Sequence, residues 1–400
     1  MKSVLYVGMP ESIHMARICR MATLGGWRVY LFPCHDGRPN PEMQEVQVFD
    51  PTNALRDWRS DDVTVIPTFP RSRLAKRPNV RAAALAAVIS RVRPDLVHAH
   101  ELQHGGYLTT AARRLLPRRV PPVIASVWGS DLSLRARMPT ELPRIRNVLK
   151  HVDVLHAECE RDLRHARSLG FTGETALPVP IAGGFNLARL SLLRAPGPTS
   201  ARRTIALKGY QSWSGRAAVA LRAVALCGAA LGGYTVEVYL ATPDTEDLVG
   251  TLSSGDGPEF SIVSRTGRAV AHEEILALHG RSRVSMGISS ADGASTSFLE
   301  AITMGSFPIQ SASACVDEWI EDGVTGFIVP SDDPAVVAAA LREAIDDDRL
   351  VDSAVAVNDT TVISRLGEER VRMVMMRLYE RVASGGIVRV GSAERTRTNG

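Results

Sequence analysis

Residues 284–310 read VSMGISSADGASTSFLEAITMGSFPIQ and alternate between apolar runs and a small-residue turn. The apolar run 284–288 predicts a buried strand, and residues 291–294 predict a turn. A short helix is predicted over 297–304, followed by a second strand at 307–309. This order of strand, helix and strand is typical of a parallel α/β unit.

The same alternation continues on both sides of this stretch. Before a Pro-, Gly- and Ser-rich segment at 194–200, strands are predicted at 4–7, 29–32, 63–66, 96–98, 123–127, 154–157 and 176–179. After it, strands are predicted at 204–207, 236–240, 261–263, 284–288, 307–309 and 326–329. We therefore predict two Rossmann-like, doubly wound parallel-sheet domains that face each other across a cleft, with ligands at the carboxyl ends of the strands.

Composition is that of a large enzyme with two cores. The chain has 400 residues, of which 45% are hydrophobic, and a formal net charge of +4 that does not argue for nucleic acid. The five cysteines are scattered without a C-x-x-C pair, which predicts neither a disulfide framework nor a zinc site. We expect a cytoplasmic protein without a membrane span, whose Arg-rich faces, such as 135–146, suit anionic substrates or peripheral contact with the inner membrane face.

The turn before the predicted helix 297–304 has the composition of a phosphate site. Four small residues form it: Gly293, Ala294, Ser295 and Thr296. Small residues let a ligand approach closely, and the free N–H groups and dipole of a helix start attract anions. Asp292 could accept hydrogen bonds from sugar hydroxyls and Glu300 from a ribose. The alternative is a capping box between Ser297 and Glu300, with Asp292 as an ordinary turn residue.

This stretch resembles the donor-site signature of retaining family-4 glycosyltransferases, in which an acidic residue precedes a Glu by eight positions. Here the pair is Asp292 and Glu300, and the run EWIEDGVTGFIVP at 318–330 extends the match. Asp292 stands where the family usually carries Glu, so its reach is shorter. The resemblance implies a GT-B fold, in which a sugar passes with retention from a nucleotide-diphosphate sugar to a hydroxyl acceptor, with no metal and no other cofactor.

Two segments of the first half also resemble this family. Residues 8–14, GMPESIH, are similar to its first loop, which implies donor-binding roles for Gly8 and His14; the alternative for His14 is a solvated or capping residue. Residues 93–101, RPDLVHAHE, are similar to a strand in which His98 and His100 share one side. No further zinc ligands accompany them. We expect His100, at the end of the strand, to be catalytic and His98 to be a packed core residue.

Residues 126–131, SVWGSD, resemble the strand end at which relatives place a His that contacts the transferred sugar. Trp128 replaces that His and can stack on a sugar or donate one N–H, but it cannot act as an acid or base. The role then passes to backbone groups or to His100. Asp131 is predicted to bind the acceptor or loop backbone, or alternatively to cap the following helix.

The second domain opens with IALKGYQSWSGR at 205–216, where relatives clamp the diphosphate with an Arg and a Lys. Tyr210 holds the Arg position here. We expect Arg216, Lys208 and Gly209 to flank the diphosphate, because a guanidinium and an ammonium both suit phosphate oxygens. The alternative is that both cations are surface charges.

The predicted domain boundaries follow from these motifs. We expect an acceptor-side domain at 1–195, a nucleotide-sugar domain at 200–365, a helix at 366–383 that crosses back to the first domain, and a disordered tail at 384–400.

The predicted function is glycosylation of a glycan, glycolipid or small molecule in polysaccharide, glycolipid or specialised-metabolite synthesis. Two alternatives stand: a nucleotide-sugar 2-epimerase-like isomerase and a non-catalytic sugar-nucleotide-binding protein. A dinucleotide-dependent dehydrogenase is disfavoured, because no G-x-G-x-x-G follows the first strand.

Overall fold

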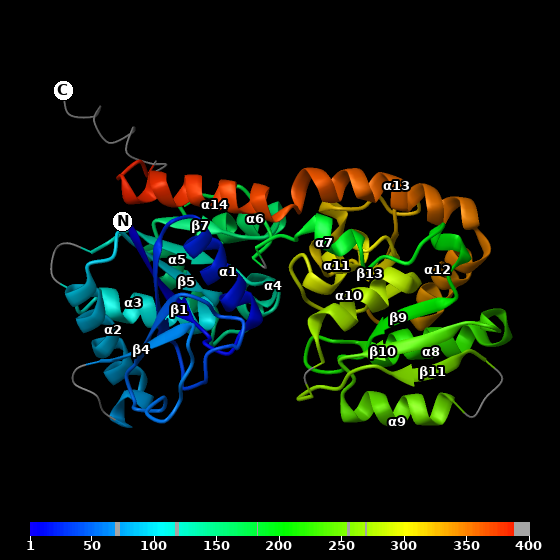
Figure 1. Cartoon of the computed structure of the whole chain (residues 1–400), viewed down its shortest axis with the longest axis horizontal. Coiled ribbons are helices and arrows are strands. Elements are labelled where there is room, and N and C mark those ends of the chain that lie inside the picture. Colours follow the sequence, from blue (N-terminus) through cyan, green and yellow to red (C-terminus); the bar gives the residue numbers. More distant parts are fainter. Residues whose placement is uncertain (69–72, 117–119, 182, 254–256, 269, 388–400) are drawn as a thin grey trace. The chain divides into compact units, whose positions relative to one another are not determined.

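The computed structural model describes residues 1–68, 73–116, 120–181, 183–253, 257–268 and 270–387. The chain divides into unit 1, Met1–Gly184 with Glu368–Gly400, and unit 2, Phe185–Gly367 (Figure 1). The predicted α/β class with two Rossmann-like parallel-sheet domains is confirmed. None of the described helices is both long and apolar enough to cross a bilayer.

Unit 1 is built on a parallel sheet whose described strands number eight, in the order β4-β3-β2-β1-β5-β6-β7-β8. They are β1 (Ser3–Gly8), β2 (Arg28–Pro33), β3 (Val46–Asp50), β4 (Val63–Pro67), β5 (Leu96–His100), β6 (Val123–Ser126), β7 (Val154–His156) and β8 (Glu174–Thr175). In β1, Leu5 and Val7 enter one core cluster, while Val4 and Tyr6 enter another. Alternating side chains therefore pack on both faces of the sheet.

Two strand predictions for unit 1 were wrong. The predicted strand 176–179 is not a strand, because Pro178 and Pro180 flank Val179 and lack the N–H groups that a sheet requires. The short strand β3 was missed, although it pairs with β2 and β4.

The helices of unit 1 connect and cover these strands. They are α1 (Ile13–Leu24), η1 (Arg73–Lys76), α2 (Pro78–Val92), η2 (Glu101–Gly106), α3 (Tyr107–Arg113), α4 (Gly129–Ser133), η3 (Arg135–Arg137), α5 (Leu142–His151), α6 (Glu160–Ser168) and α14 (Glu368–Ala383). Of these, η2 is a π-helix, a form that is rare and often found at functional sites.

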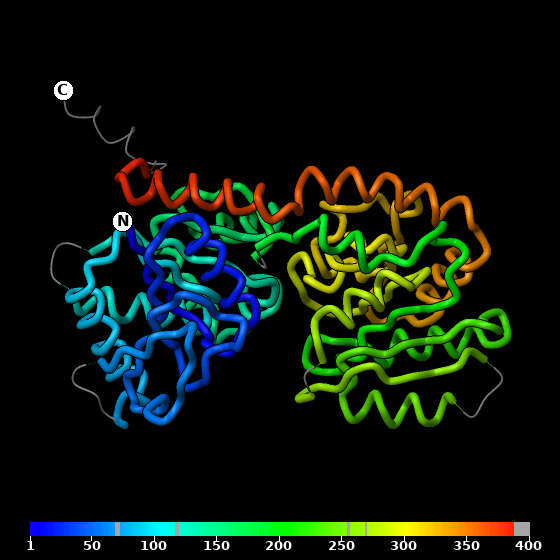
Figure 2. The backbone as a smooth tube through the Cα atoms, viewed as in Figure 1, coloured from blue at the N-terminus to red at the C-terminus, as the bar shows by residue number. Residues whose placement is uncertain are grey.

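Helix α14 belongs to unit 1 although it follows unit 2 in the chain. Figure 2 shows this red segment alongside the blue N-terminal part of the backbone, and it contacts both α1 and β5. Val371, Met375 and Tyr379 are buried in the core cluster that also contains Val4 and Tyr6. Residues 384–387 follow α14, and the remainder of the predicted tail, 388–400, lies outside the described residues.

Unit 2 is built on a second parallel sheet, whose six described strands have the order β11-β10-β9-β12-β13-β14. They are β9 (Thr204–Lys208), β10 (Thr235–Tyr239), β11 (Glu259–Ile262), β12 (Ser282–Gly287), β13 (Phe307–Ser311) and β14 (Phe327–Val329). All six lie where the sequence predicted strands, with small shifts at their ends. Because β9 and β12 are neighbours, the loops that follow them start at the same edge of the sheet.

The helices of unit 2 connect its strands. They are α7 (Leu187–Ser191), η4 (Thr199–Ala201), α8 (Ala217–Cys227), η5 (Gly228–Leu231), α9 (Pro243–Leu252), α10 (His272–Arg281), α11 (Thr296–Thr303), η6 (Cys315–Glu318), α12 (Pro334–Asp346) and α13 (Asp348–Arg365). Residues 185–195 were predicted to lie in the first domain, but they belong to unit 2. Phe185 and Leu190 share a core cluster with Leu366.

The Tyr379 hydroxyl ties α14 to the sheet of unit 1. It lies 2.6 Å from His98 Nδ1 and 2.9 Å from the Tyr6 hydroxyl, and all three side chains are buried. We expect Tyr379→Phe to lower the free energy of unfolding by about 1–3 kcal/mol, because buried polar groups then lack a partner. Urea denaturation measures this loss. Met373→Ala, at an exposed position of the same helix, serves as control, and an equal loss in both variants would contradict the assignment.

Candidate active site

The loops after β9 and β12 are joined by backbone hydrogen bonds. Arg216 N donates to Ile288 O at 2.9 Å, and Ser290 N donates to Ser214 O at 2.7 Å. These bonds bring the segment after Lys208 beside the segment that leads to Asp292. The structure therefore brings together two groups of predicted donor-site residues that lie about 80 positions apart in the chain.

Two glycines allow the loop after β9 to fold tightly. A Cβ on Gly215 would lie 1.9 Å from Tyr210 O, and a Cβ on Gly209 would lie 2.5 Å from Val238 Cγ1. Neither contact is tolerable, so both positions need glycine for steric reasons. Gly209 also receives a hydrogen bond at its carbonyl from the Thr245 hydroxyl, at 2.8 Å.

Lys208 reaches the start of α11. Its Nζ lies 3.3 Å from Ser295 Oγ, and Ser295 Oγ lies 3.0 Å from Ser297 Oγ. Ser295 is the N-cap of α11 and makes no side-chain capping bond within the described residues. A half-buried ammonium, two hydroxyls and the first N–H groups of a helix thus gather at one point, which is the arrangement that binds phosphate.

The turn before α11 is held from both sides. Asp292 Oδ1 accepts a hydrogen bond from Gly293 N at 2.9 Å, and Gly293 O accepts one from Cys315 N at 3.1 Å. Asp292 is half-buried, whereas Ala294 is buried. The turn is therefore shaped before any ligand arrives, and Thr296 then begins the helix.

Glu300 is buried in α11 and paired with a histidine that the sequence did not indicate. Its Oε1 lies 2.6 Å from His272 Nε2, and its residue exposure is 5%. The capping-box alternative is excluded, because Ser295 is the N-cap and Ser297 lies inside the helix. His272 begins α10, 28 positions before Glu300, and no local pattern connects the two.

Arg216 lies at the N-cap of α8 and turns its guanidinium back to its own loop. Its Nη1 donates to Ser212 O at 3.1 Å and to Gly215 O at 2.8 Å. These bonds brace the loop around Gly215. The remaining guanidinium N–H groups are the ones with which the predicted phosphate contact would be made.

His98 is a core residue, as predicted. Its Nε2 lies 2.7 Å from Ser126 Oγ, and its Nδ1 lies beside the Tyr379 hydroxyl. Ser126 Oγ in turn lies 2.8 Å from His156 Nδ1. Burial lowers the pKa of His98 well below its ordinary value and that of His156 to about 4, so this network is neutral.

His100 differs from His98 in its hydrogen bonding. It is 1% exposed, and neither ring nitrogen has a hydrogen-bond partner within the part of the chain that the structure describes. Burial lowers its pKa to about 3, with further contributions from His156 and His14. An imidazole in this state is neutral at physiological pH and can orient a ligand by hydrogen bonding, but it is a weak base.

Gly8, His14 and Trp128 lie near the same edge of the sheet. Gly8 ends β1, where a Cβ would lie 3.4 Å from His100 Cβ. His14, in the first turn of α1, meets the indole of Trp128 edge-on with ring centroids 5.6 Å apart. The buried Trp128 Nε1 has no hydrogen-bond partner among the described residues, so it is available as a donor.

Asp131 holds backbone rather than lying open to solvent. It is 0% exposed, and its Oδ2 accepts hydrogen bonds from Leu102 N at 2.8 Å and Trp128 N at 3.0 Å. Burial raises its pKa well above the ordinary value. Its side chain therefore connects η2 with the turn at Trp128, which matches the predicted contact with loop backbone.

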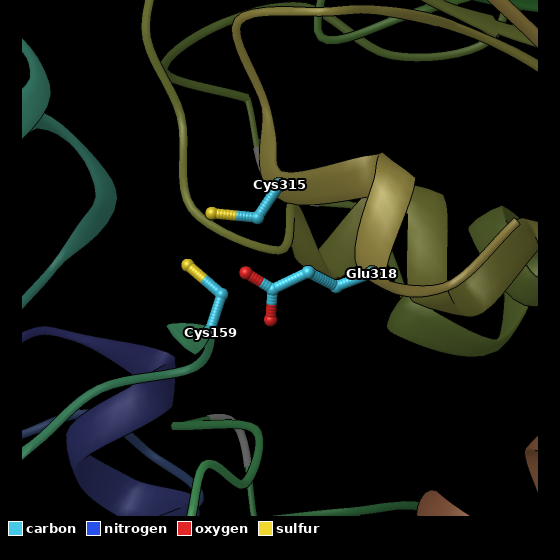
Figure 3. A group of neighbouring side chains, drawn as sticks. All are labelled: Cys159, Cys315 and Glu318. Carbon is cyan, nitrogen blue, oxygen red and sulfur yellow. The ribbon is translucent and has the colours of Figure 1, made fainter. Parts of the chain in front are cut away.

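Cysteine side chains were also considered as metal ligands. Cys19, Cys34 and Cys227 are free. Figure 3 draws Cys315 and Glu318, which both lie in η6 of unit 2, with Cys159, which precedes α6 of unit 1. Because this group is divided between the two units, we do not assign it as a site.

Two family models match the chain. The first, "Glycosyl transferase 4-like", covers residues 3–155, and the second, "Glycosyl transferases group 1", covers residues 265–357. The second match contains the turn at 291–296, Glu300 and His272. No curated protein matches the sequence.

Many solved structures match this fold, and three of them with low sequence identity illustrate it. A sucrose-phosphate synthase from Thermosynechococcus elongatus is 15% identical with a TM-score of 0.72, covering 96% of this chain and 100% of its own. Anabaena HepE in complex with UDP is 14% identical with a TM-score of 0.67 and the same coverages. A glycosyltransferase from Rickettsia africae is 12% identical with a TM-score of 0.65, covering 95% of this chain and 98% of its own.

The buried histidines predict a loss of stability in mild acid. His98, His100 and His156 have lowered pKa values in the folded chain, so below about pH 6.5 the unfolded chain binds more protons and the free energy of unfolding falls. The raised pKa of Asp131 opposes this by at most one proton. We expect His156→Gln to reduce the slope between pH 6 and 5 by about 1.4 kcal/mol per pH unit, measured by urea denaturation. An unchanged slope would contradict a neutral buried His156.

Proposed function

Since this chain belongs to the family-4-like, group 1 glycosyltransferases, we propose that it transfers a sugar from a nucleoside-diphosphate sugar to a hydroxyl acceptor with retention of configuration and without a metal ion. The acceptor is a glycan, a glycolipid or a small molecule in the cytoplasm or at the inner membrane face.

One observation carries this proposal: Lys208 and the start of α11 converge on the turn at 292–296, and Glu300 lies one turn farther along the same helix. A diphosphate bound at the helix start would meet backbone N–H groups, two hydroxyls and an ammonium. The carboxylate of Glu300 would then accept hydrogen bonds from the ribose, while His272 keeps it oriented.

Departure of the nucleoside diphosphate places negative charge on its β-phosphate, and this charge needs stabilisation. The ammonium of Lys208 and the positive end of α11 would supply it, which is why we propose that no metal is needed. Arg216 would add a contact through its remaining N–H groups. Asp292 would bind a hydroxyl of the transferred sugar.

The proposed retaining course requires no protein base. Because the pKa of His100 is about 3, we assign it, with Trp128, to orientation of the sugar by hydrogen bonding. The acceptor hydroxyl would attack on the face from which the diphosphate leaves, and the leaving phosphate oxygen would take its proton. His14 and Gly8 would border the donor, and Asp131 keeps the turn at Trp128 in place.

The ribose contact can be separated from the ion pair by two variants. Glu300→Gln and His272→Gln both alter the pair, but only the first removes the carboxylate that is proposed to bind the ribose. We expect Glu300→Gln to weaken nucleotide binding about tenfold, since a hydrogen bond to a carboxylate is replaced by a weaker one to a neutral amide, and His272→Gln to change it less than about threefold. Isothermal titration with UDP is the first measurement, because HepE, which has this fold, is solved with UDP and with UDP-glucose. Unchanged UDP affinity in a folded Glu300→Gln variant would refute the ribose assignment.

Stereochemistry and metal use are tested together. With an α-linked donor, we expect an α-linked product by proton NMR and an unchanged rate in excess EDTA. Lys208→Ala should lower kcat by about a hundredfold, because stabilisation of the leaving group is lost, while Lys150→Ala, exposed in unit 1, should not. A β-linked product would rule out retention.

Two outcomes would favour the alternative functions. Conversion of the donor sugar without any acceptor would indicate a 2-epimerase-like isomerase. Tight nucleotide binding without turnover of any donor would indicate a non-catalytic binding protein. This alternative is considered because Trp128 and Tyr210 stand where relatives carry a His and an Arg.

A further inference from the structure

A pocket of about 690 Å³ opens in unit 1 among α2, α3 and α5. Its lining includes Cys34, which directly follows β2, and Gln103, which lies in η2 directly after β5. The pocket is therefore at the carboxyl edge of the sheet, where α/β folds bind ligands. Its volume is in the range of small-molecule sites.

The charged residues that line the pocket are mainly cations. Lys76, Arg81, Arg114 and Arg144 all line it, against the single lining carboxylate of Asp36. Arg81 is 4% exposed and is neutralised by Asp36, with which it forms an ion pair. Because the ion pair of Arg81 and Asp36 forms part of the pocket wall, we do not expect an anion to displace it.

The other cations remain able to bind a ligand. Arg114 Nη2 donates to the neutral amide oxygen of Asn147 at 2.7 Å, and no described carboxylate forms an ion pair with it. Lys76 Nζ is 3.8 Å from Asp36, and its side chain is 72% exposed. The Lys76 ammonium, which is only distantly paired with Asp36, and the Arg114 guanidinium, which has no described carboxylate partner, are suited to phosphate or carboxylate oxygens.

The third cation is oriented by an aromatic ring. The Arg144 guanidinium lies over the Tyr107 ring at 4.0 Å, and its Nη1 donates to Glu141 at 3.1 Å. The Tyr107 hydroxyl also donates to Glu141, at 2.7 Å. This wall is therefore rigid, which reduces the entropy cost of binding a ligand.

Polar groups without charge accompany these cations. The amide nitrogen and oxygen of Gln103 are both buried, and neither has a hydrogen-bond partner within the described segments. An amide in that state can donate to and accept from the hydroxyls of a sugar or polyol. A buried amide that is left unpaired costs stability, so its presence beside a pocket indicates a ligand partner.

The backbone that carries Gln103 is strained in a way that is typical of binding sites. Glu101 has φ of 63° and is the first residue of the π-helix η2. Gly105 permits this turn, because a Cβ there would lie 2.3 Å from Val7 O and 2.5 Å from His100 O. The strained turn is thus packed directly on β1 and β5, next to His100.

We propose that this pocket binds the anionic portion of the acceptor, and that the acceptor is a sugar or polyol bearing a phosphate or carboxylate group. Arg114 and Lys76 bind the anion, and Gln103 binds a hydroxyl. This inference rests on the proposed function, since it names the acceptor class of the same reaction.

The test is isothermal titration of the full chain, in the presence of UDP, with glucose 6-phosphate, glucuronate and glucose as probes. We expect both anionic probes to bind roughly tenfold more tightly than glucose, because each gains charge-assisted hydrogen bonds. Arg114→Ala and Lys76→Ala should each weaken binding of glucose 6-phosphate by roughly tenfold. Arg146→Ala, an exposed arginine of α5 outside the pocket lining, should leave it unchanged.

Three results would overturn the inference: equal binding of all three probes, no binding of any, or an equal loss in Arg146→Ala and Arg114→Ala. Vesicles identify the source of the anion. A lipid-borne acceptor is supported if the protein sediments with phosphatidylglycerol vesicles but not with phosphatidylcholine vesicles, and if Arg114→Ala abolishes this sedimentation. Sedimentation with neither lipid, together with binding of glucose 6-phosphate, supports a soluble one.

Titration of UDP alone separates this inference from the proposed function. UDP affinity should be the same in wild type, Arg114→Ala and Lys76→Ala, because the donor candidates Lys208 and Glu300 are in unit 2. Normal UDP binding without binding of an anionic probe would refute the pocket assignment only. Failure of every nucleoside diphosphate to bind would refute the proposed function.

Discussion

The candidate site of unit 2 depends on the close approach of two backbones near Gly215. The loop after β9 and the loop after β12 exchange hydrogen bonds at Arg216 and Ser290, and a Cβ on Gly215 would collide with Tyr210 O within the first of these loops. This contact places Lys208 beside the start of α11. A parallel sheet brings the two strands together, but only the paired loops bring the ammonium and the helix start within hydrogen-bonding distance.

Unit 1 is organised by a different kind of constraint, a buried and neutral hydrogen-bond network. Tyr379, His98, Ser126 and His156 connect α14 through β5 and β6 to β7. Their polar groups satisfy one another, so burial stabilises a single arrangement of the strands. His100, on the same strand as His98, is outside this network, and neither of its ring nitrogens has a hydrogen-bond partner among the described residues.

Local patterns in the sequence predicted most of this fold and part of the site. Apolar runs identified all the strands of unit 2, and small residues followed by a helix identified the turn at 291–296. The short strand β3 was missed because Gln47 interrupts its apolar run. The partner of Glu300 was also missed, because His272 approaches it only through the packing of α10 against α11. The pocket around Arg114 likewise depends on three helices that are far apart in the chain.

The position of α14 has a consequence for how the chain folds during synthesis. Unit 1 is interrupted along the chain by the whole of unit 2, and its core contains Val371, Met375 and Tyr379. A ribosome would therefore release a complete unit 2 sequence before the last helix of unit 1 emerges. Until then, α14 does not cover the face of the first sheet around Tyr6 and His98, and His98 lacks its hydrogen bond with the Tyr379 hydroxyl. Unit 1 can therefore complete its core only after the sequence of unit 2 has been synthesised.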